Sequence, residues 1–437
     1  MKLRIALAIF AVPVLLLAQG EPSAPAGPRI IVLKAARLFD GKGDSVVPNG
    51  VVIVEGGLVK AAGSGLAIPA GAKVIDLGDA TLLPGLIDSH THLGGELADN
   101  WLQNTIDDQR ATLPEATILA TGFARRTLMA GFTTVRDVGS WNFVDVGLRN
   151  TVRNGVIPGP RMLIALQALG ARGGHCDKNG FPYRFFGPEP GIEKGIAAGA
   201  DQFRDAVRFQ VKYGADLIKV CATGGVLSLA DEVDTPQLTQ EEMNAIVDEG
   251  HRLRKKVAAH AHGAEGAKVA IRAGADSIEH GSFLDDEALR MMKERGTYLV
   301  PTLLAGEFVA DDARHFPPEI AAKARQAVAA RSNTFKKALK MGVKIAFGTD
   351  SSVSPHGINA QEFALLVDHG MSPAAALRSA TTVAADLLGL AKLIGALEPG
   401  KAADVIAVPG NPLQDIKVME RVKFVMKGGE VFRNDTP

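Results

Sequence analysis

Two histidines separated by one residue, His90 and His92, follow an apolar segment that begins at Leu82. Side chains alternate between the two faces of a β-strand, so these imidazoles project from the same face toward a common point. Nitrogen ligands placed in this way are suited to a divalent metal ion. A histidine pair also occurs on solvated surfaces and in hydrogen-bonded cores, so further ligands in the chain must decide between these interpretations.

Further candidate ligands follow later apolar segments: Lys219, His260, His262, His280 and Asp350. Each alone has an ordinary explanation: Lys219 could reach solvent, His280 could cap a turn, and Asp350 could begin a helix. Lys219 is the hardest to explain in this way, because it lies within the apolar run 217–220. A buried ammonium group is costly unless it is neutralised or chemically altered.

From residue 85 onward, strand-like segments alternate with helical ones, which is the pattern of βα units around a parallel sheet. The expected strands are at residues 85–92, 133–138, 161–169, 216–223, 256–262, 277–281, 298–303 and 344–350. The expected helices are at residues 114–130, 202–213, 240–254 and 321–341. Eight such units close a (β/α)8 TIM barrel, an α/β fold whose active site lies at the carboxyl ends of the strands. The candidate ligands lie at these ends, so we expect them at one rim.

Both ends of the chain contain short β-branched segments separated by turns, at residues 29–83 and again at 403–426. We therefore expect a small β-sandwich domain built from both ends. Its N-terminal part would span residues 27–84 and its C-terminal part 397–437, with the barrel at 85–396 between them.

The first 26 residues resemble a secretory signal peptide. Lys2 and Arg4 precede an apolar run, residues 5–17, that is too short to span a bilayer. We expect a secreted or periplasmic protein with no stable membrane insertion after cleavage, and a retained anchor is the alternative. Cys176 and Cys221 could pair in an oxidising compartment, although the sequence fixes no distance between them.

The charges of the 437-residue chain are balanced, with 48 Lys and Arg against 48 Asp and Glu. There is no basic field to bind nucleic acid or an anionic membrane. We expect a small neutral or zwitterionic ligand as the partner, and a homo-oligomer.

The candidate ligands match, in order, those of the amidohydrolase superfamily of binuclear metal hydrolases, which the chain resembles over nearly everything after the signal. His90 and His92 follow Pro-Gly, Lys219 lies in Ile-Lys-Val, His260 in Ala-His-Ala-His-Gly, His280 in Ile-Glu-His-Gly, and Asp350 in Gly-Thr-Asp. The motifs Gly-Gly-His at 173–175 and Cys-Ala-Thr-Gly-Gly-Val at 221–226 resemble one branch. That branch contains prolidase-like, Xaa-amino-acid dipeptidases and ochratoxin-hydrolysing enzymes.

This resemblance implies two divalent ions, expected to be zinc, and a carboxylated Lys219 (N6-carboxylysine) that bridges them. One ion would take His90, His92 and Asp350, and the other His260 and His280. A hydroxide between the ions would attack the amide carbonyl, while Asp350 would pass a proton to the leaving amine.

Two histidines remain for the substrate, His262 and His175. His262 shares a strand face with His260, and we expect it to contact the substrate or to support a metal ligand. His175 follows the third strand in a glycine-rich loop, where a substrate contact and a simple turn are the alternatives.

We therefore expect a metal-dependent hydrolase that cleaves dipeptides or N-acyl amino acids, including ochratoxin-type amides. The alternatives are a cyclic-amide or lactone hydrolase similar to imidazolonepropionase, and a catalytically inactive binding barrel. The loop at 227–234 departs from peptidase relatives, because it has no Arg, Lys or Tyr to bind a substrate carboxylate. Arg172, Lys178 and Arg184 are candidates for that role, with a solvated surface as the alternative.

Overall fold

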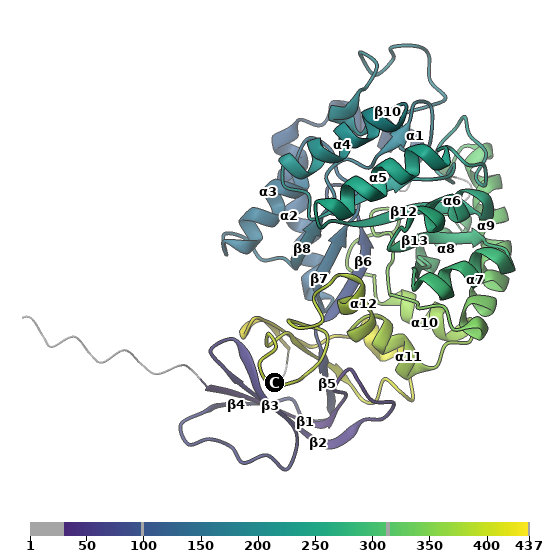
Figure 1. Ribbon diagram of the computed structural model, residues 1–437. Helices are drawn as coiled ribbons and strands as arrows, with labels where there is room; N and C mark the ends of the chain where they lie inside the picture. Colours follow the sequence, from purple (N-terminus) through teal and green to yellow (C-terminus); the bar gives the residue numbers. More distant parts are fainter. Residues whose placement is uncertain (1–29, 98–99, 312–314, 436–437) are drawn as a thin grey trace, which may run out of the picture.

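The computed structural model describes residues 30–97, 100–311 and 315–435 (Figure 1). The expected signal peptide lies outside these residues. In the part of the chain that is described, no helix is both long enough and apolar enough to cross a membrane.

The two ends of the chain meet in one eight-stranded mixed sheet, drawn in the lower part of Figure 1. Its strands are β1 (Ile30–Leu38), β2 (Val47–Glu55), β3 (Leu58–Ser64), β4 (Lys73–Asp76), β5 (Ala80–Pro84), β15 (Val405–Pro409), β16 (Phe424–Lys427) and β17 (Glu430–Asn434). β15 runs antiparallel to β5 and so joins the C-terminal strands to the N-terminal ones. We expected a sandwich, but the hydrogen bonds of these strands form one continuous sheet. Leu33, Val52 and Val405 belong to its core.

Parallel strands form two separate arcs above this sheet. The first arc contains β6 (Leu86–Thr91), β7 (Phe132–Asp137) and β8 (Arg161–Ile164), and the second contains β11 (Leu217–Cys221), β12 (Lys256–Gly263), β13 (Ser277–Phe283) and β14 (Tyr298–Val300). Between them in the sequence, β9 (Gly170–Ala171) and β10 (Ile196–Ala197) form a short parallel pair. Seven of the expected barrel strands thus have a counterpart in the two arcs.

The two arcs are connected by backbone hydrogen bonds where the third expected strand meets the fourth. The amide of Leu169 donates to the carbonyl of Lys219 over 2.8 Å, and the amide of Cys221 donates back to Leu169 over 2.8 Å. Leu169 lies at the end of the segment expected as the third strand. Its pairing places that segment beside β11, as the order of a TIM barrel requires.

The eighth expected strand, residues 344–350, forms isolated bridges rather than a regular ladder. On one side the carbonyl of Phe347 accepts a hydrogen bond from Ser89 in β6 over 2.9 Å. The amide of Phe347, however, donates to the carbonyl of Ser379 over 3.0 Å. Because this amide is already used, a continuous ladder with the neighbouring strand does not form.

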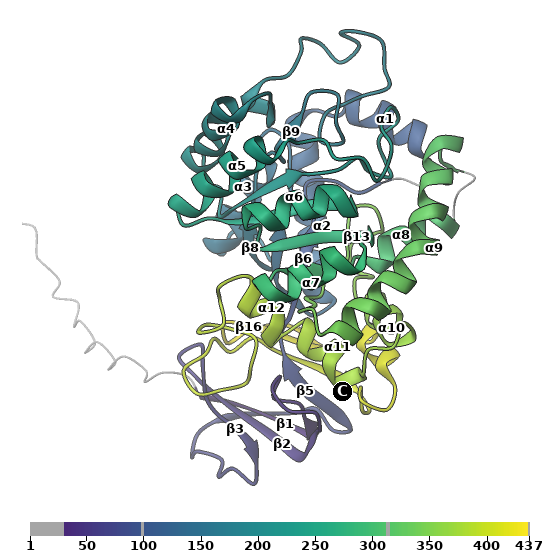
Figure 2. The same cartoon turned by 45° about the vertical axis from the view of Figure 1, so that its right-hand side comes forward.

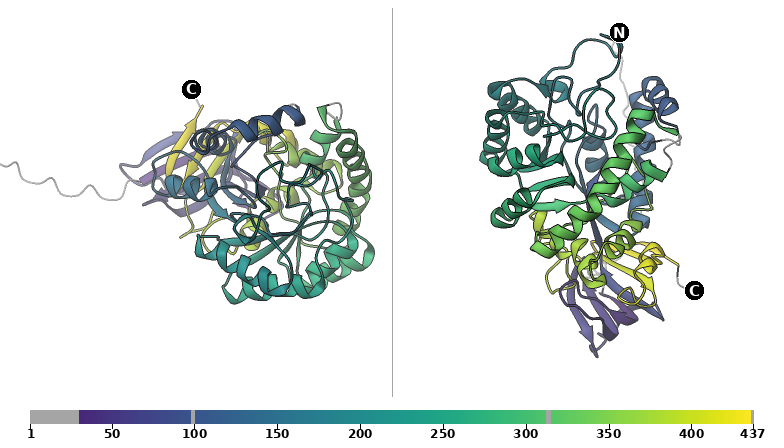
Figure 3. Two further views of the ribbon diagram at one scale, coloured as in Figure 1. Left: turned by 90° about the horizontal axis from the view of Figure 1, so that it is seen from above. Right: turned by 90° about the vertical axis from the view of Figure 1, so that its right-hand side faces the viewer.

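Helices surround the strands, as the view from above in Figure 3 and the turned view in Figure 2 show. They are α1 (Trp101–Arg110), α2 (Leu113–Met129), α3 (Val144–Arg153), α4 (Ala200–Lys212), α5 (Gln240–Arg252), α6 (Ala264–Ala273), α7 (Asp286–Arg295), α8 (Leu303–Asp311), α9 (Pro318–Met341), α10 (Gln361–Asp368), α11 (Pro373–Ser379) and α12 (Thr382–Leu387), with single 3-10 turns at η1 (Ile192–Lys194) and η3 (Ile416–Glu420). The four helices expected from the sequence correspond to α2, α4, α5 and α9. Thr112 and Glu115 form a capping box that begins α2, and Gly342 at φ +72° ends α9.

The alternation of side chains along β12 separates the packing face from the chemical face. Val257 and Ala259 belong to the main hydrophobic core between strands and helices. Ala258 packs in a separate small cluster, and His260 and His262 share its face of the strand. The two histidines are therefore held on the inner face, with the outer face anchored by apolar burial.

The buried carboxylate of Asp404 ties the β domain to the first arc. Its Oδ2 accepts a hydrogen bond from Arg161 Nη1 over 2.6 Å and from Thr133 Oγ1 over 3.3 Å. Its Oδ1 accepts the amide of Gly428 over 2.8 Å. Charged partners on both sides of the junction fix the β domain against the strand ends opposite the candidate ligands.

A disulfide joins Cys176 to Cys221, which are 45 positions apart in sequence and have their Cα atoms 6.0 Å apart. Cys221 ends β11, two residues after Lys219, and Cys176 directly follows His175. The bond thus fastens the loop of His175 to the strand of Lys219.

We expect the double substitution Cys176→Ala/Cys221→Ala to lower the free energy of unfolding by about 2–4 kcal/mol, because it releases a long closed loop in the unfolded chain. Urea unfolding of this variant and of the wild type, each with and without reductant, measures the effect. Two titratable thiols in the unreduced wild type, with an unchanged urea midpoint in the variant, would contradict the bond.

Candidate metal centre

Two adjoining clusters of potential metal ligands lie at the carboxyl ends of the barrel strands. The first contains His90, His92 and Asp350, and the second contains His260, His262 and His280. Within each cluster the ligand atoms lie within 4.8 Å of one another. The rings of His90 and His280 are 5.0 Å apart between centroids, so the clusters are neighbours. Residues far apart in sequence thus converge on one point, as expected from the barrel.

The first cluster is centred on the carboxylate of Asp350. Its Oδ1 lies 3.4 Å from His90 Nε2 and 3.3 Å from His92 Nε2. The other nitrogen of each ring has a partner of its own: Nδ1 of His90 lies 2.7 Å from Glu279 Oε2, and Nδ1 of His92 lies 2.8 Å from the Gly139 carbonyl. These acceptors assign the proton of the neutral ring to Nδ1, which leaves each Nε2 lone pair available as a ligand.

The second cluster has a similar arrangement for two of its three rings. Nδ1 of His262 lies 2.9 Å from Ser282 Oγ, and Nδ1 of His280 lies 2.7 Å from Thr302 Oγ1. His260 differs, because its Nε2 lies 3.0 Å from the carbonyl of Gly224. All three rings are within reach of one ion, so the assignment of His260 to the metal and of His262 to the substrate stays a prediction.

Burial keeps the imidazoles of the second cluster neutral. It lowers the pKa of His262 to about 3 and holds the pKa values of His260 and His280 well below the usual range, with neighbouring positive groups adding to the effect. Burial alone would raise the pKa of Asp350, but His90 and His92 outweigh it and hold that pKa well below its usual range. Neutral imidazole and ionised carboxylate are the forms that bind a metal ion.

Lys219 adjoins the first cluster, with its Nζ 3.5 Å from His90 Nε2. The side chain is only 4% exposed, and among the described residues no carboxylate is within ion-pair distance of its Nζ. Burial lowers the pKa of Lys219 to about 8, although Glu279 and Asp350 act in the opposite direction. A buried amine without a bonded counterion beside two ligand clusters fits the carboxylated lysine that the resemblance implies.

The sequence analysis did not single out the charged pair that supports His90. Arg136 Nη2 donates to Glu279 Oε1 over 2.8 Å, and Arg136 Nε donates to the carbonyl of Ser89 over 2.5 Å. Burial would raise the pKa of Glu279, but Arg136 and His90 lower it to about 2. Arg136 and Glu279 lie in the strands Phe-Thr-Thr-Val-Arg-Asp and Ser-Ile-Glu-His-Gly-Ser-Phe, whose polar neighbours gave no signal of burial in the sequence.

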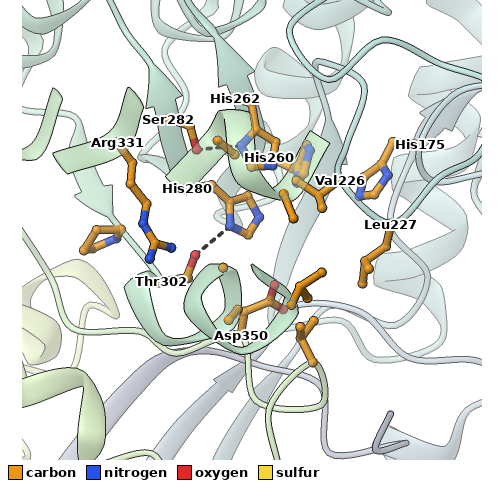
Figure 4. Close-up of a pocket in the computed structure, with 17 residues that line it drawn as sticks. His175, Val226, Leu227, His260, His262, His280, Ser282, Thr302, Arg331 and Asp350 are labelled. Carbon is orange, nitrogen blue, oxygen red and sulfur yellow. Dashed lines mark hydrogen bonds between the residues drawn. The ribbon is translucent and has the colours of Figure 1, made fainter. Parts of the chain in front are cut away.

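His175 lies against the second cluster and lines the pocket on the side away from Arg331 (Figure 4). Its ring stacks on that of His260 with centroids 4.3 Å apart, and its Nδ1 lies 2.9 Å from Ser228 Oγ. A Cβ at Gly225 would lie 2.1 Å from His175 Cε1, so this close approach requires glycine. His175 and His262 both line the pocket, while their role as substrate contacts stays a prediction.

The pocket beside the metal centre has an apolar wall and one cation that the sequence analysis missed. Val226, Leu227 and Val353 form part of the wall, and Arg331 of α9 lies at one end (Figure 4). The earlier candidates Arg172, Lys178 and Arg184 are exposed and do not line it. Position 331 gave no signal, because an arginine within a helical pattern is usually solvated.

We expect Glu279→Gln to lower the free energy of unfolding by about 3–5 kcal/mol, because it leaves Arg136 buried without its counterion. Metal affinity should fall by about 10- to 100-fold, since His90 loses the carboxylate that orients it. Chemical denaturation and metal titration measure the two effects. Asp76→Asn is the control, because the exposed Lys34–Asp76 pair at 3.0 Å should contribute less than about 1 kcal/mol. Equal losses in the two variants would contradict this account.

Comparison with known proteins agrees with this geometry. Residues 81–432 match the amidohydrolase family. The chain is 34% identical to ochratoxinase of Aspergillus niger over 429 residues, covering 93% of this chain and 87% of that protein. A Xaa-Pro dipeptidase solved with methionine in its active site is 42% identical, with a TM-score of 0.87 over 93% of this chain and 100% of that one. Imidazolonepropionase of Sphingopyxis alaskensis is 26% identical over 411 residues, 85% of this chain and 89% of that protein.

These likenesses confirm the resemblance found in the sequence and support a TIM barrel with an additional domain. They also make the protein an enzyme, since its ligand clusters and pocket occur in a chain similar throughout to hydrolases. The chain belongs to the amidohydrolase family, in the branch that contains ochratoxinase and prolidase-like dipeptidases.

Proposed function

We propose that this enzyme is a metal-dependent hydrolase of the amide bond in dipeptides or N-acyl amino acids, ochratoxin-type amides included. The observation that carries the proposal is the pair of adjoining ligand clusters, with the buried amine of Lys219 beside them and a partly apolar pocket in front. The similarity to ochratoxinase and to a Xaa-Pro dipeptidase supports the same class of substrate.

The residues present fit two divalent ions. His90, His92 and Asp350 would hold one ion and His260 and His280 the other, with Lys219 as N6-carboxylysine bridging them. Imidazole nitrogen and carboxylate oxygen favour zinc. When bound, such ions would lower the pKa of a bound water and polarise the carbonyl of the substrate.

The side chains of the protein would move the proton and orient the substrate. Asp350 is ionised, so one of its oxygens accepts the proton of the attacking water and returns it to the leaving nitrogen. Without that proton, the amine would have to leave as a poor anion. Burial lowers the pKa of His175 to about 4, so its ring is neutral and is oriented by Ser228 toward the pocket. His262 and His175 would contact the substrate from two sides of the second cluster.

A panel of substrates tests the proposal against its alternatives. We expect the zinc-loaded enzyme to hydrolyse linear N-acyl amino acids and dipeptides, measured by release of the free amine. Faster opening of cyclic amides or lactones would favour the imidazolonepropionase-like alternative, for which the 26% identity gives weaker support. No hydrolysis of any member of the panel would leave the inactive binding barrel, which the complete ligand set argues against.

We expect Lys219→Ala to retain the fold but lose most bound metal and more than about 100-fold in activity, because the bridging ligand is removed from an apolar strand. Metal content and melting temperature, measured on the same sample, check this. A short-chain carboxylic acid added to the variant should restore part of the rate by replacing the bridge.

The other explanation of Lys219, an amine paired with an acid, predicts a loss of about 3–5 kcal/mol in stability, with metal content falling only as the protein unfolds. If Lys219→Ala still bound two metal ions and kept near-normal turnover, the binuclear proposal would be wrong. The same metal assay on His260→Asn and His262→Asn decides which of these histidines is the ligand.

Export to the periplasm or the medium, and assembly into a homo-oligomer, remain proposals that rest on the sequence. Cell fractionation tests the first, and light scattering of the purified protein tests the second. Protein retained in the cytosol, or a monomer at all concentrations, would contradict them.

A further inference from the structure

One charged side chain in the pocket has no part in the proposed chemistry. Arg331, on α9, is 5% exposed and lines the pocket together with His262 and His280. Figure 4 shows its guanidinium on the same side as Thr302, whose hydroxyl bonds to His280. A buried guanidinium this close to a reaction centre requires an explanation, because burying a charge is costly without partners.

The hydrogen bonds of Arg331 are mostly unused within the described part of the chain. Its Nη2 donates to Glu307 Oε1 over 2.7 Å, while its Nε is buried without a partner. A guanidinium has five N–H donors in one plane. Burial lowers the pKa of Arg331, although the carboxylates of Glu307 and Glu362 act in the opposite direction. Because Nε is fully buried, the donors that remain for a ligand are those of Nη1 and the second N–H of Nη2.

Small residues leave room around the guanidinium. A Cβ at Gly306 would lie 2.2 Å from Arg331 Nη1, so the side chain passes close to the backbone of α8 only because position 306 is glycine. Ala305, Ala324 and Ala327 line the same part of the pocket. A larger side chain at position 306 would displace the guanidinium, and larger side chains at the three alanines would reduce the pocket that it lines.

We propose that Arg331 is the specificity residue that binds the free carboxylate of the substrate. This rests on the proposed function, whose substrates release an amine that carries an α-carboxylate, and it names the residue that recognises that group. Planar carboxylates accept two parallel hydrogen bonds from a guanidinium, and the pairing is strongest where water is excluded. In such substrates the carboxylate carbon is two bonds from the scissile nitrogen, about 2.5 Å away. One pocket therefore holds both the reacting amide and its anchor.

A purely structural role makes a different prediction. As a clamp between α8 and α9 through Glu307, Arg331 would affect stability and the hydrolysis of every substrate alike. As a carboxylate anchor, it discriminates between a free acid and the corresponding amide. The apolar wall of Val226, Leu227 and Val353 suits an aliphatic side chain, so we choose leucine derivatives as probes.

The experiment compares N-acetyl-L-leucine with N-acetyl-L-leucinamide, measured as acetate release by the zinc-loaded enzyme. We expect Arg331→Met to lower kcat/KM for the acid by about 10- to 100-fold, mostly through KM, and to leave the amide within about threefold. Arg331→Lys should lose part of this preference, because ammonium keeps the charge without the planar pair. Arg325→Met, the same substitution at an exposed position of the same helix, should change neither value.

Binding of N-acetyl-L-leucine, measured by calorimetry, gives a second readout that needs no turnover. We expect affinity to fall in Arg331→Met and in Arg331→Lys but not in Arg325→Met. An equal loss for acid and amide, or unchanged binding of the acid, would overturn the role of Arg331. If the wild type hydrolyses both substrates at equal kcat/KM, only this inference fails. If it binds the acid through Arg331 but hydrolyses neither probe nor any panel amide, the proposed function fails instead.

Discussion

The structure depends on pairing its buried charged side chains with groups of opposite charge. Lys219, Arg136 and Glu279 are buried within the barrel strands, and Asp350 lies beside them at the strand ends. An unpaired charge in such a place costs several kcal/mol. Arg136 and Glu279 compensate each other, and the same carboxylate orients His90. Lys219 has no such partner, and that deficit is what makes a carbamate between two metal ions the consistent proposal.

The proposed function depends on two buried cationic side chains, Lys219 and Arg331, and on the groups that can pair with them. At the candidate metal centre, two histidine clusters and the carboxylate of Asp350 surround a buried amine, and divalent cations would complete this set of ligands. In the same pocket, the guanidinium of Arg331 is paired with the carboxylate of Glu307. Under the proposed function, a substrate that carries an amide and a carboxylate would bind at the metal centre and at Arg331 in one pocket.

The rest of the chain holds these groups in place. Apolar residues on the outer faces of the strands pack against the helices, and Asp404 fixes the β domain at the opposite end. The disulfide fastens the loop of His175 to β11. His175 can then stack on His260 while the strand beside it carries Lys219. Positions that contact neither metal nor substrate thus control how closely the reacting groups approach.

The sequence by itself determined the α/β alternation, the pairing of the two chain ends, and the strand ends at which the ligands lie. Local rules suffice there: side chains at i and i+2 share a strand face, which places His90 with His92 and His260 with His262. A charged residue within an apolar run signals burial wherever it occurs, and this singled out Lys219. The rule does not reach Arg136 and Glu279, because both have polar neighbours along their strands.

Only the tertiary structure decided the contacts between distant segments. The pairing of Cys176 with Cys221 and the bond of Glu279 to His90 depend on distances across the barrel, which no local pattern encodes. The irregular eighth segment arises because Ser379 takes the amide of Phe347. Arg331 looks like any solvated helix residue until the packing of α8 against α9 buries it and turns it toward the pocket. The burial and the orientation of a side chain depend on how the whole chain packs, and they decide which charged groups can contact a ligand.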